Sequence, residues 1–96
     1  MSIKIDYLIV GSGLTGGTIA RMLQNSGREV LILERRNHIG GNVHDHFHPS
    51  GIRIHTYGPH YFRTNSDNLW EFVNRFSSFY KYEASLKSFV DGNFEN

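Results

Sequence analysis

Three glycines near the start of the chain have the spacing of a phosphate-binding loop. Gly11, Gly13 and Gly16 form a G-x-G-x-x-G pattern that follows the apolar run YLIV and precedes a helix-like segment. The first glycine permits a tight turn, the second lets a diphosphate approach the backbone, and the third lets the helix pack closely on the strand. Free N–H groups at the start of the helix attract phosphate. The pattern predicts a dinucleotide site, with a glycine-rich turn that binds nothing as the alternative.

An acidic residue in the next apolar segment supports this prediction. Glu34 ends the run EVLILE, eighteen residues after Gly16. Its carboxylate can accept hydrogen bonds from the two hydroxyl groups of an adenine ribose, and it would repel a 2′-phosphate. The ligand is therefore expected to be an adenine dinucleotide other than NADP.

A second glycine motif favours FAD over NAD. Arg36 and Gly40–Gly41 form an R-x-x-x-G-G pattern after Glu34, and many flavoproteins of the glutathione-reductase type carry such a motif at this place. Adjacent glycines expose backbone N–H groups, and an arginine adds positive charge near a diphosphate. NAD stays open as the alternative cofactor.

The elements that would position these residues are a strand, a helix and a second strand. Ile3–Val10 and Glu29–Glu34 are rich in Ile, Leu and Val, as buried parallel strands are. Between them, Thr15–Ser26 has an apolar stripe with helical spacing, and Gly27 can cap that helix in a left-handed conformation. These segments form a βαβ unit over residues 3–34.

The middle of the chain predicts a hairpin followed by a helix. Val43–Phe47 and Ile52–Tyr57 flank the turn sequence HPSG. A helix is expected near Asp67–Phe76, with Asn65 or Ser66 as its N-cap.

Together these elements predict an α/β fold, a Rossmann-like βαβ FAD- or NAD(P)-binding domain with an inserted β-hairpin. Residues 1–96 are expected to be the N-terminal part of that domain, with the βαβ unit at 3–34, the FAD loop and hairpin at 35–64, and a helix and strand at 65–96. Tyr82–Val90 is the expected last strand, and the final VDGNFEN has the pattern of a turn and the start of a return strand. We therefore expect an incomplete part of a larger flavoprotein.

Composition argues against several other classes of function. With 10 basic and 9 acidic residues, the formal net charge is +1, which gives no argument for nucleic acid or a membrane surface as a partner. The chain has no cysteine, so it offers no disulfide and no thiolate metal site, which fits a reducing cytoplasm. No apolar run in the sequence is long enough to span a bilayer.

Alternating histidines in the expected hairpin raise the question of a metal. His44, His46 and His48 would share one strand face, with His55 across the hairpin. Three imidazoles on one face could hold zinc or copper, but ligand number alone says little about geometry. A solvated hairpin face without a metal is the preferred interpretation.

Three strings of this sequence resemble the N-terminal part of bacterial UDP-galactopyranose mutases. They are YLIVGSGLTGG, LERRNHIGGN and IHTYGPHYFRTN. The third is the most specific, because a Y-G-P/A-H-I-F-H-T-like segment faces the flavin in that family. The helix around LWEFVNRF is similar to the family's W-x-Y-V-N helix. The resemblance covers nearly the whole chain and weakens after about Phe76.

This resemblance implies a flavin-dependent isomerase that interconverts UDP-galactopyranose and UDP-galactofuranose for polysaccharide synthesis. In that family the FAD must be reduced, and flavin N5 is thought to attack the anomeric carbon and form a sugar adduct before the ring recloses as a furanose. The nucleophile therefore belongs to the cofactor. A cytoplasmic enzyme is implied, without nucleic acid or membrane insertion, and a homodimer stays open.

The resemblance also implies which residues hold the cofactor. Glu34 would hold the adenine ribose with Arg35 nearby, and Gly41 and Asn42 would approach the ribityl and phosphate groups. His60 would lie against the isoalloxazine ring and is the single candidate catalytic side chain. The implied FAD-binding set is Gly11, Gly13, Leu14, Thr15, Gly16, Glu34, Arg35, Arg36, Gly40, Gly41, Asn42, His60 and Tyr61.

Two positions depart from the family pattern. Arg63 stands where the family often has a second histidine, and Ala84 stands where it often has an asparagine near the substrate. The family's catalytic arginines and uridine-binding aromatics have no counterpart here, so the chain alone is expected to be inactive. Another FAD-dependent oxidoreductase of the amine-oxidase-like group, or a non-catalytic nucleotide-binding fragment, are the alternative functions.

Overall fold

The computed structural model describes residues 2–95 and divides the chain into two compact units. The first unit extends to Tyr61 and the second begins at Phe62. The first unit contains β1 (Tyr7–Val10), α1 (Leu14–Asn25) and β2 (Val30–Leu33). It therefore contains the βαβ unit that the sequence predicts.

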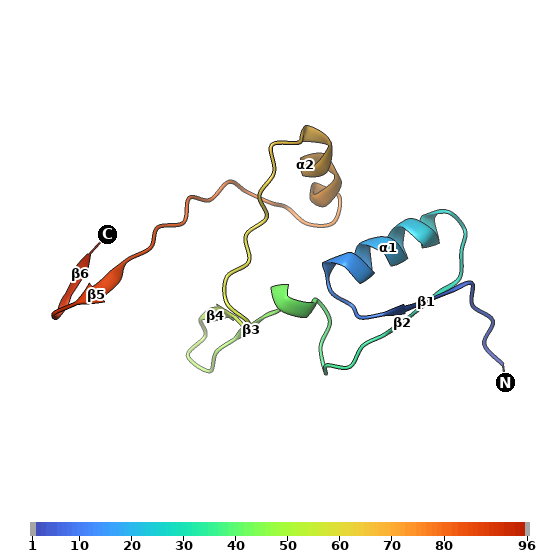
Figure 1. Cartoon of the computed structure of the whole chain (residues 1–96), viewed down its shortest axis with the longest axis horizontal. Coiled ribbons are helices and arrows are strands. Elements are labelled where there is room, and N and C mark those ends of the chain that lie inside the picture. Colours follow the sequence, from blue (N-terminus) through green and yellow to red (C-terminus); the bar gives the residue numbers. More distant parts are fainter. Residues whose placement is uncertain (1, 96) are drawn as a thin grey trace. The chain divides into compact units, whose positions relative to one another are not determined.

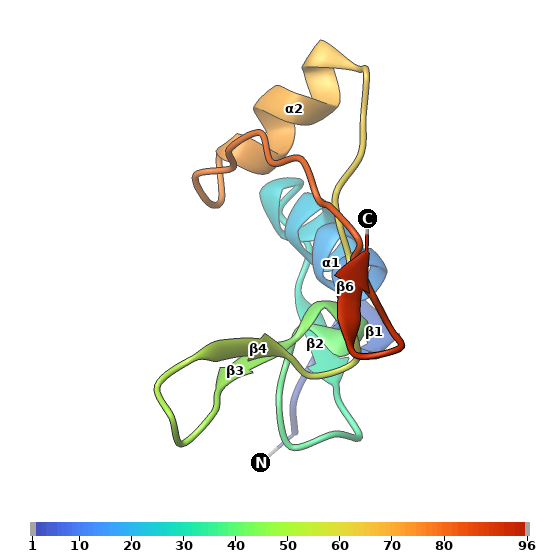
Figure 2. The same ribbon diagram turned by 90° about the vertical axis from the view of Figure 1, so that its left-hand side faces the viewer.

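In this βαβ unit the two strands are parallel and in register from Tyr7 opposite Val30 to Val10 opposite Leu33. Helix α1 packs against both strands (Figures 1 and 2). Ala20, on α1, is only 8% exposed and is the one buried residue in the described part of the chain. The short side chain therefore lies where the helix needs close contact with the sheet.

Strand β1 is shorter than the predicted Ile3–Val10. The backbone N–H groups of Asp6 and Tyr7 both donate to the carbonyl of Glu29, and the paired residues begin at Tyr7. Regular strand structure requires a hydrogen-bonded partner. The segment before Tyr7 has no paired residues on β2, so it is not part of the strand.

The hairpin of the first unit follows a short 3-10 helix at Gly41–Val43. Its strands are β3 (Asp45–Phe47) and β4 (Arg53–His55), which pair antiparallel with Asp45 opposite His55. Arg53 forms an ion pair with Asp45, and its guanidinium lies 4.1 Å from the centre of the Phe47 ring. The predicted hairpin is therefore confirmed, with shorter strands.

The first regular element of the second unit is α2 (Asp67–Asn74), and Ser66 is its N-cap. The Ser66 hydroxyl accepts a hydrogen bond from the Leu69 N–H at 3.3 Å, as the sequence predicts. The helix ends at Asn74 rather than Phe76, because the Asn74 side chain bonds the Trp70 carbonyl at 2.8 Å and accepts from the Phe79 N–H at 2.9 Å. These two bonds turn the chain away from the helix axis.

The predicted strand Tyr82–Val90 is wrong over most of its length. Only Ser88–Val90 forms a strand, β5, which pairs with β6 (Asn93–Glu95). The turn between them has positive φ at Asp91 (49°) and Gly92 (83°), as a tight two-residue hairpin requires. Because β6 is three residues long, it offers no partner to the residues before Ser88.

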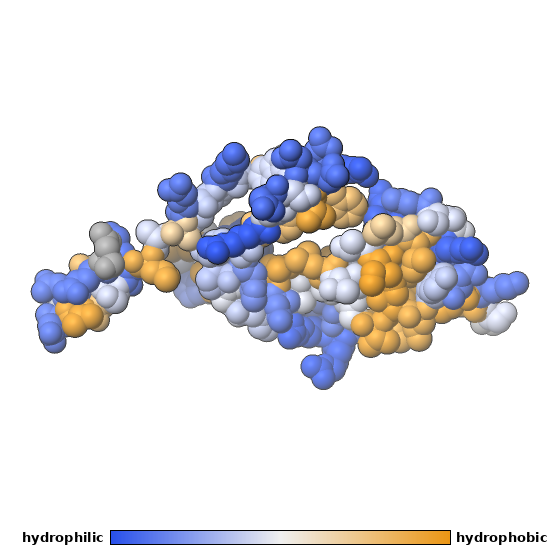
Figure 3. Space-filling model, turned by 45° about the horizontal axis from the view of Figure 1, so that its top comes forward, coloured by the Kyte–Doolittle hydropathy of each residue, from blue (hydrophilic) through white to orange (hydrophobic). Residues whose placement is uncertain are grey.

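Apolar side chains are widely exposed in both units. Figure 3 shows them gathered in patches on the face that it presents. Val10 is 82% exposed in the first unit, and Phe94 is 74% exposed in the second. Neither unit encloses large side chains, since no side chain in the described residues is fully buried.

Candidate dinucleotide-binding site

The two glycine loops of the first unit lie directly against each other. The Gly40 N–H donates to the Ser12 carbonyl at 2.9 Å. A Cβ added at Gly41 would lie 2.9 Å from the Cα of Gly13, and Gly41 also has a left-handed φ of 60°. No other residue fits this position without moving one loop. The second motif therefore completes the first loop rather than forming a separate site.

The third glycine of the first motif packs the helix onto the turn. A Cβ added at Gly16 would lie 2.1 Å from the carbonyl oxygen of Gly11 and 3.3 Å from the Ile9 side chain. The Gly17 N–H then makes the first bond of the helix, to the Gly13 carbonyl at 2.9 Å. This is the close helix–strand packing that the glycine spacing predicts.

Glu34 ties the end of β2 to the first loop. One carboxylate oxygen, Oε1, accepts from the Ser12 N–H at 3.0 Å and from the Ser12 hydroxyl at 2.7 Å. The other, Oε2, accepts from the Arg36 N–H at 2.8 Å. The N–H of Arg36 and the hydroxyl and N–H of Ser12 lower the pKa of Glu34 to about 2, while partial desolvation opposes them. Glu34 is therefore a carboxylate at neutral pH.

Ser12 is a site residue that the sequence reasoning missed. Its hydroxyl and its N–H both donate to Glu34, so it joins the end of β2 to the first glycine loop. The available signal was a small hydroxyl residue between the first two glycines, which can bond an acid at the neighbouring strand end.

A pocket of about 680 Å³ opens beside these loops. Eleven of the thirteen predicted cofactor residues line it, and His60 and Tyr61 do not. The apolar lining residues Ile9, Val10, Ile19 and Val43 were not predicted as site residues. The predicted residues in the lining are Gly11, Gly13, Leu14, Thr15, Gly16, Glu34, Arg35, Arg36, Gly40, Gly41 and Asn42.

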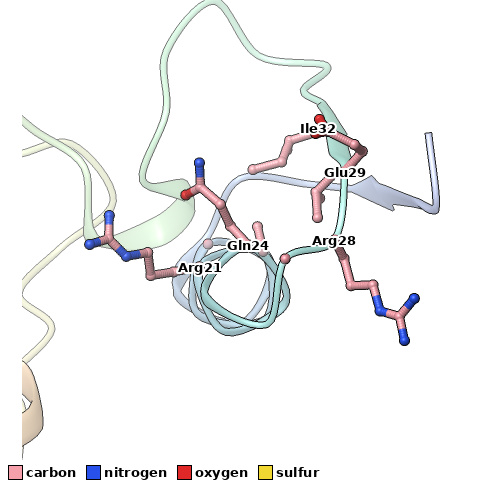
Figure 4. Close-up of a pocket in the computed structure, with 9 residues that line it drawn as sticks. Arg21, Gln24, Arg28, Glu29 and Ile32 are labelled. Carbon is pink, nitrogen blue, oxygen red and sulfur yellow. The ribbon is translucent and has the colours of Figure 1, made fainter. Parts of the chain in front are cut away.

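A second pocket, of about 430 Å³, lies elsewhere along α1 and contains none of the predicted residues. Figure 4 shows Arg21 and Gln24 on the helix, Ile32 on β2 with Glu29 just before that strand, and the Arg28 side chain pointing away from the helix. It has no glycine loop and no helix N-terminus, so it lacks the cradle of backbone N–H groups that the first pocket offers to a phosphate.

Two of the hairpin histidines share one threonine hydroxyl, and the third bonds within its own turn. His44 Nδ1 and His46 Nδ1 lie 2.7 and 2.8 Å from the Thr56 hydroxyl oxygen. His48 lies beyond the end of β3, and its Nδ1 accepts from the Ser50 N–H at 3.1 Å. Within residues 2–95, no group of three His, Cys, Asp or Glu side chains has an arrangement that could hold a metal ion.

None of the described helices has the length and apolar character that crossing a membrane requires.

The sequence matches one family model and several curated proteins. The model, described as NAD(P)-binding Rossmann-like domain, matches residues 9–76. The dTDP-fucopyranose mutase of Escherichia coli is 44% identical over 86 residues, which are 88% of this chain and 23% of that protein. The probable UDP-galactopyranose mutase of Klebsiella pneumoniae is 41% identical over 88 residues, 91% of this chain and 23% of that protein.

A third relative matches a shorter segment. The flavin-containing amine oxidase B of Bos taurus is 41% identical over 44 residues, which are 46% of this chain and 8% of that protein.

These matches confirm the resemblance to UDP-galactopyranose mutases and the predicted Rossmann-like fold. The chain spans about a quarter of the length of the mutases that it matches. The family model includes both glycine loops, Glu34 and α2, and covers more than half of the chain. The chain therefore belongs to the NAD(P)-binding Rossmann-like domain family.

Proposed function

We propose that this chain is the FAD-binding part of a flavin-dependent mutase that interconverts UDP-galactopyranose and UDP-galactofuranose. The observation that carries the proposal is the extent of the matches. Similarity to sugar-nucleotide mutases covers about nine-tenths of the chain, whereas similarity to amine oxidase B covers less than half. The docked glycine loops supply the kind of phosphate cradle that such a cofactor needs.

The residues present fit an adenine dinucleotide. The turn at Gly11–Gly16 and the start of α1 would receive the diphosphate, and the missing Cβ atoms of Gly13 and Gly41 let the second loop lie against this turn. Arg36 donates from its side chain to Asn42 at 3.2 Å and would add positive charge beside the phosphates. Glu34 Oε2 has accepted one N–H and has capacity for a ribose hydroxyl.

The chemistry assigned to the protein in this proposal is limited to binding and orientation. When bound and reduced, FAD supplies the nucleophilic N5 atom, and its own electrons are not consumed in the net reaction. His60 and Tyr61 are proposed to face the ring system. Both are exposed in the first unit and lie outside the pocket lining.

A second candidate differs only in the sugar nucleotide. The Escherichia coli relative named dTDP-fucopyranose mutase is 44% identical, against 41% for the Klebsiella pneumoniae protein. Both relatives match almost the same share of the chain, so the substrate must be decided by turnover. An amine-oxidase-like enzyme remains the third candidate, because amine oxidase B is 41% identical over 44 residues of this chain.

The cofactor is tested by titrating the intact protein that contains this chain with FAD, NAD and NADP by calorimetry. We expect FAD to bind more tightly than NAD, and NADP to bind least because Glu34 repels its 2′-phosphate. Gly41→Ala should abolish binding by separating the loops. Gly51→Ala is the matched control, since Gly51 also has positive φ (88°) but a Cβ there would meet nothing within 4 Å. Equal binding by both variants, or no preference for FAD, would contradict the assignment.

The reaction is tested on the intact protein that contains this chain, reduced with dithionite. We expect conversion of UDP-galactofuranose to UDP-galactopyranose without oxygen uptake. Conversion of a dTDP-fucose substrate instead would select the second candidate. Oxygen consumption with an amine, and no change in either sugar nucleotide, would select the third.

A further inference from the structure

A cluster of aromatic side chains joins the second glycine loop to the hairpin. The rings of His38 and His44 are stacked, with 3.8 Å between their centres and 21° between their planes. His38 Nε2 lies 2.7 Å from the Tyr57 hydroxyl, and His44 Nδ1 lies 2.7 Å from the Thr56 hydroxyl. His38 precedes Gly40 and His44 follows Gly41, so the stacked rings bring together the two ends of the second glycine loop.

The hydrogen bonds define the neutral form of His38. Its Nδ1 lies 2.9 Å from the Ile39 carbonyl, which can only accept, so this nitrogen carries the hydrogen. The neutral ring then has an unprotonated Nε2, which accepts from the Tyr57 hydroxyl. A second proton on His38 would reverse that bond and place a positive charge in the stack.

The Thr56 hydroxyl restricts which nitrogen atoms of His44 and His46 can carry a hydrogen. It has a single hydroxyl hydrogen, yet both His44 Nδ1 and His46 Nδ1 lie within 2.8 Å of its oxygen. Only one of the two rings can accept that hydrogen, and the other must donate. His44 and His46 are 6.2 Å apart between ring centres, so two protonated rings here would also repel.

Charges from several segments surround the stack. His46 and Asp45 come from β3, and Asp45 is paired with Arg53 of β4. Arg36 lies with its guanidinium 4.3 Å from the centre of the Tyr57 ring, on the side of the second loop. Positive groups therefore outnumber the one carboxylate, and that carboxylate is already paired with Arg53.

The pKa of His44 agrees with this arrangement. Desolvation, followed by the His38 and His46 charges, lowers it below its ordinary value, and Asp45 acts in the opposite direction. A depressed folded-state pKa means that stability is lost as the pH falls below about 6.5, the ordinary value, through the folded value.

We propose that His38 and His44 are positioning residues that form a proton-sensitive clamp on the second glycine loop. At neutral pH the stacked neutral rings hold Gly40 and Gly41 against the first loop. When the pH is low enough to protonate both rings, their like charges push the rings apart and loosen this loop. The adjoining pocket then binds its ligand less tightly.

The clamp itself is tested by nuclear magnetic resonance on the labelled 96-residue chain between pH 8 and pH 5. We expect the His44 midpoint to lie below its ordinary value of 6.5, because desolvation and the neighbouring His38 and His46 charges disfavour its charged form. The Gly40 and Gly41 amide resonances should shift with that same midpoint. A His44 midpoint at or above 6.5, or glycine amides that do not follow it, would overturn the proposal.

Two variants separate the clamp from a general loss of structure. His38→Phe keeps a ring in the stack but cannot take a proton, so the His44 midpoint should rise and the glycine shifts should shrink. His44→Phe likewise leaves only one titratable ring in the stack, so the glycine shifts should shrink in that variant too. His48→Gln is the control, because His48 bonds only within its own turn. Glycine shifts unchanged in both Phe variants would count against the clamp.

The effect on the pocket rests on the proposed function and is measured on the intact protein that contains this chain, with FAD as the probe. We expect its dissociation constant to be about fivefold higher at pH 5.5 than at pH 8, a typical coupling between two sites. The ratio of the two dissociation constants should approach one in His38→Phe. An unchanged fivefold ratio in that variant would refute the coupling. If FAD fails to bind at pH 8, the proposed cofactor is wrong, while the magnetic resonance result still decides the clamp.

Discussion

At the scale of single residues, the densest set of hydrogen bonds around the site belongs to Glu34. Its two oxygens take three protein donors, from Ser12 and from the Arg36 backbone. The carboxylate therefore has a structural role that does not depend on any ligand. A ribose would bind to a group that is already fixed in place, which lowers the cost of ordering it.

Glu34→Gln should destabilise the chain in a pH-dependent way. An amide has one acceptor oxygen, and its NH₂ group would face an N–H donor. Because the folded pKa of Glu34, about 2, lies below the ordinary value of 4.5, its contribution to stability is complete above about pH 4.5 and is lost as the pH falls toward 2. Urea unfolding at pH 7, 5 and 3 measures the difference between wild type and variant.

The expected difference is constant from pH 7 to pH 5 and smaller at pH 3. A difference that stays the same at all three values would show that the ionised form of Glu34 is not what holds Ser12 and Arg36.

At the scale of elements, two neighbouring glycines at the start of α1 differ in whether there is space for a side chain. Gly16 lies against the turn, where a Cβ would come 2.1 Å from the Gly11 carbonyl oxygen, while a Cβ at Gly17 would meet nothing within 4 Å. Both are helical residues. The difference between them is therefore packing and not backbone conformation.

Gly16→Ala should cost about 1–3 kcal/mol of the free energy of unfolding, because the helix must move away from the turn. Gly17→Ala should instead stabilise the chain by about 0.5–1 kcal/mol, the usual gain for alanine over glycine inside a helix. Thermal unfolding followed by circular dichroism measures both. Equal effects of the two substitutions would mean that α1 does not pack on the turn as described.

At the scale of the whole molecule, the exposed apolar surface is the main physical feature. Leu8, Leu31 and Ile32 of the parallel strands are between 37% and 54% exposed, although the strand sequences have the apolar character of a buried sheet. A two-stranded sheet covered by one helix leaves its edges and its other face open. Such surface is attractive to other apolar groups.

The 96-residue chain is therefore expected to bind the dye ANS and to self-associate as its concentration rises. Dye fluorescence and sedimentation at several protein concentrations check this. Adding FAD should reduce dye binding only modestly, since the pocket includes few of the exposed apolar residues. A monomer at all concentrations without dye fluorescence would contradict the exposure described for β1 and β2.

Much of this protein follows from short stretches of its sequence. The glycine spacing predicts the turn before α1, the apolar runs predict the strands, and Ser66 predicts the start of α2, because each depends on backbone preferences within a few residues. Glu34 and the second glycine pair were likewise found from their order along the chain. Their roles toward a ligand stay predictions.

Tertiary structure alone decided how far each strand extends and which side chains meet. The contact of Gly41 with Gly13, the bonds from Ser12 to Glu34 and the bond between His38 and Tyr57 join segments that are separate in sequence. The strand after Tyr82 fails for the same reason, since pairing depends on a partner and not on propensity. The backbone conformation that a short segment prefers depends on neighbouring residues, whereas contacts between distant segments form only when the chain folds.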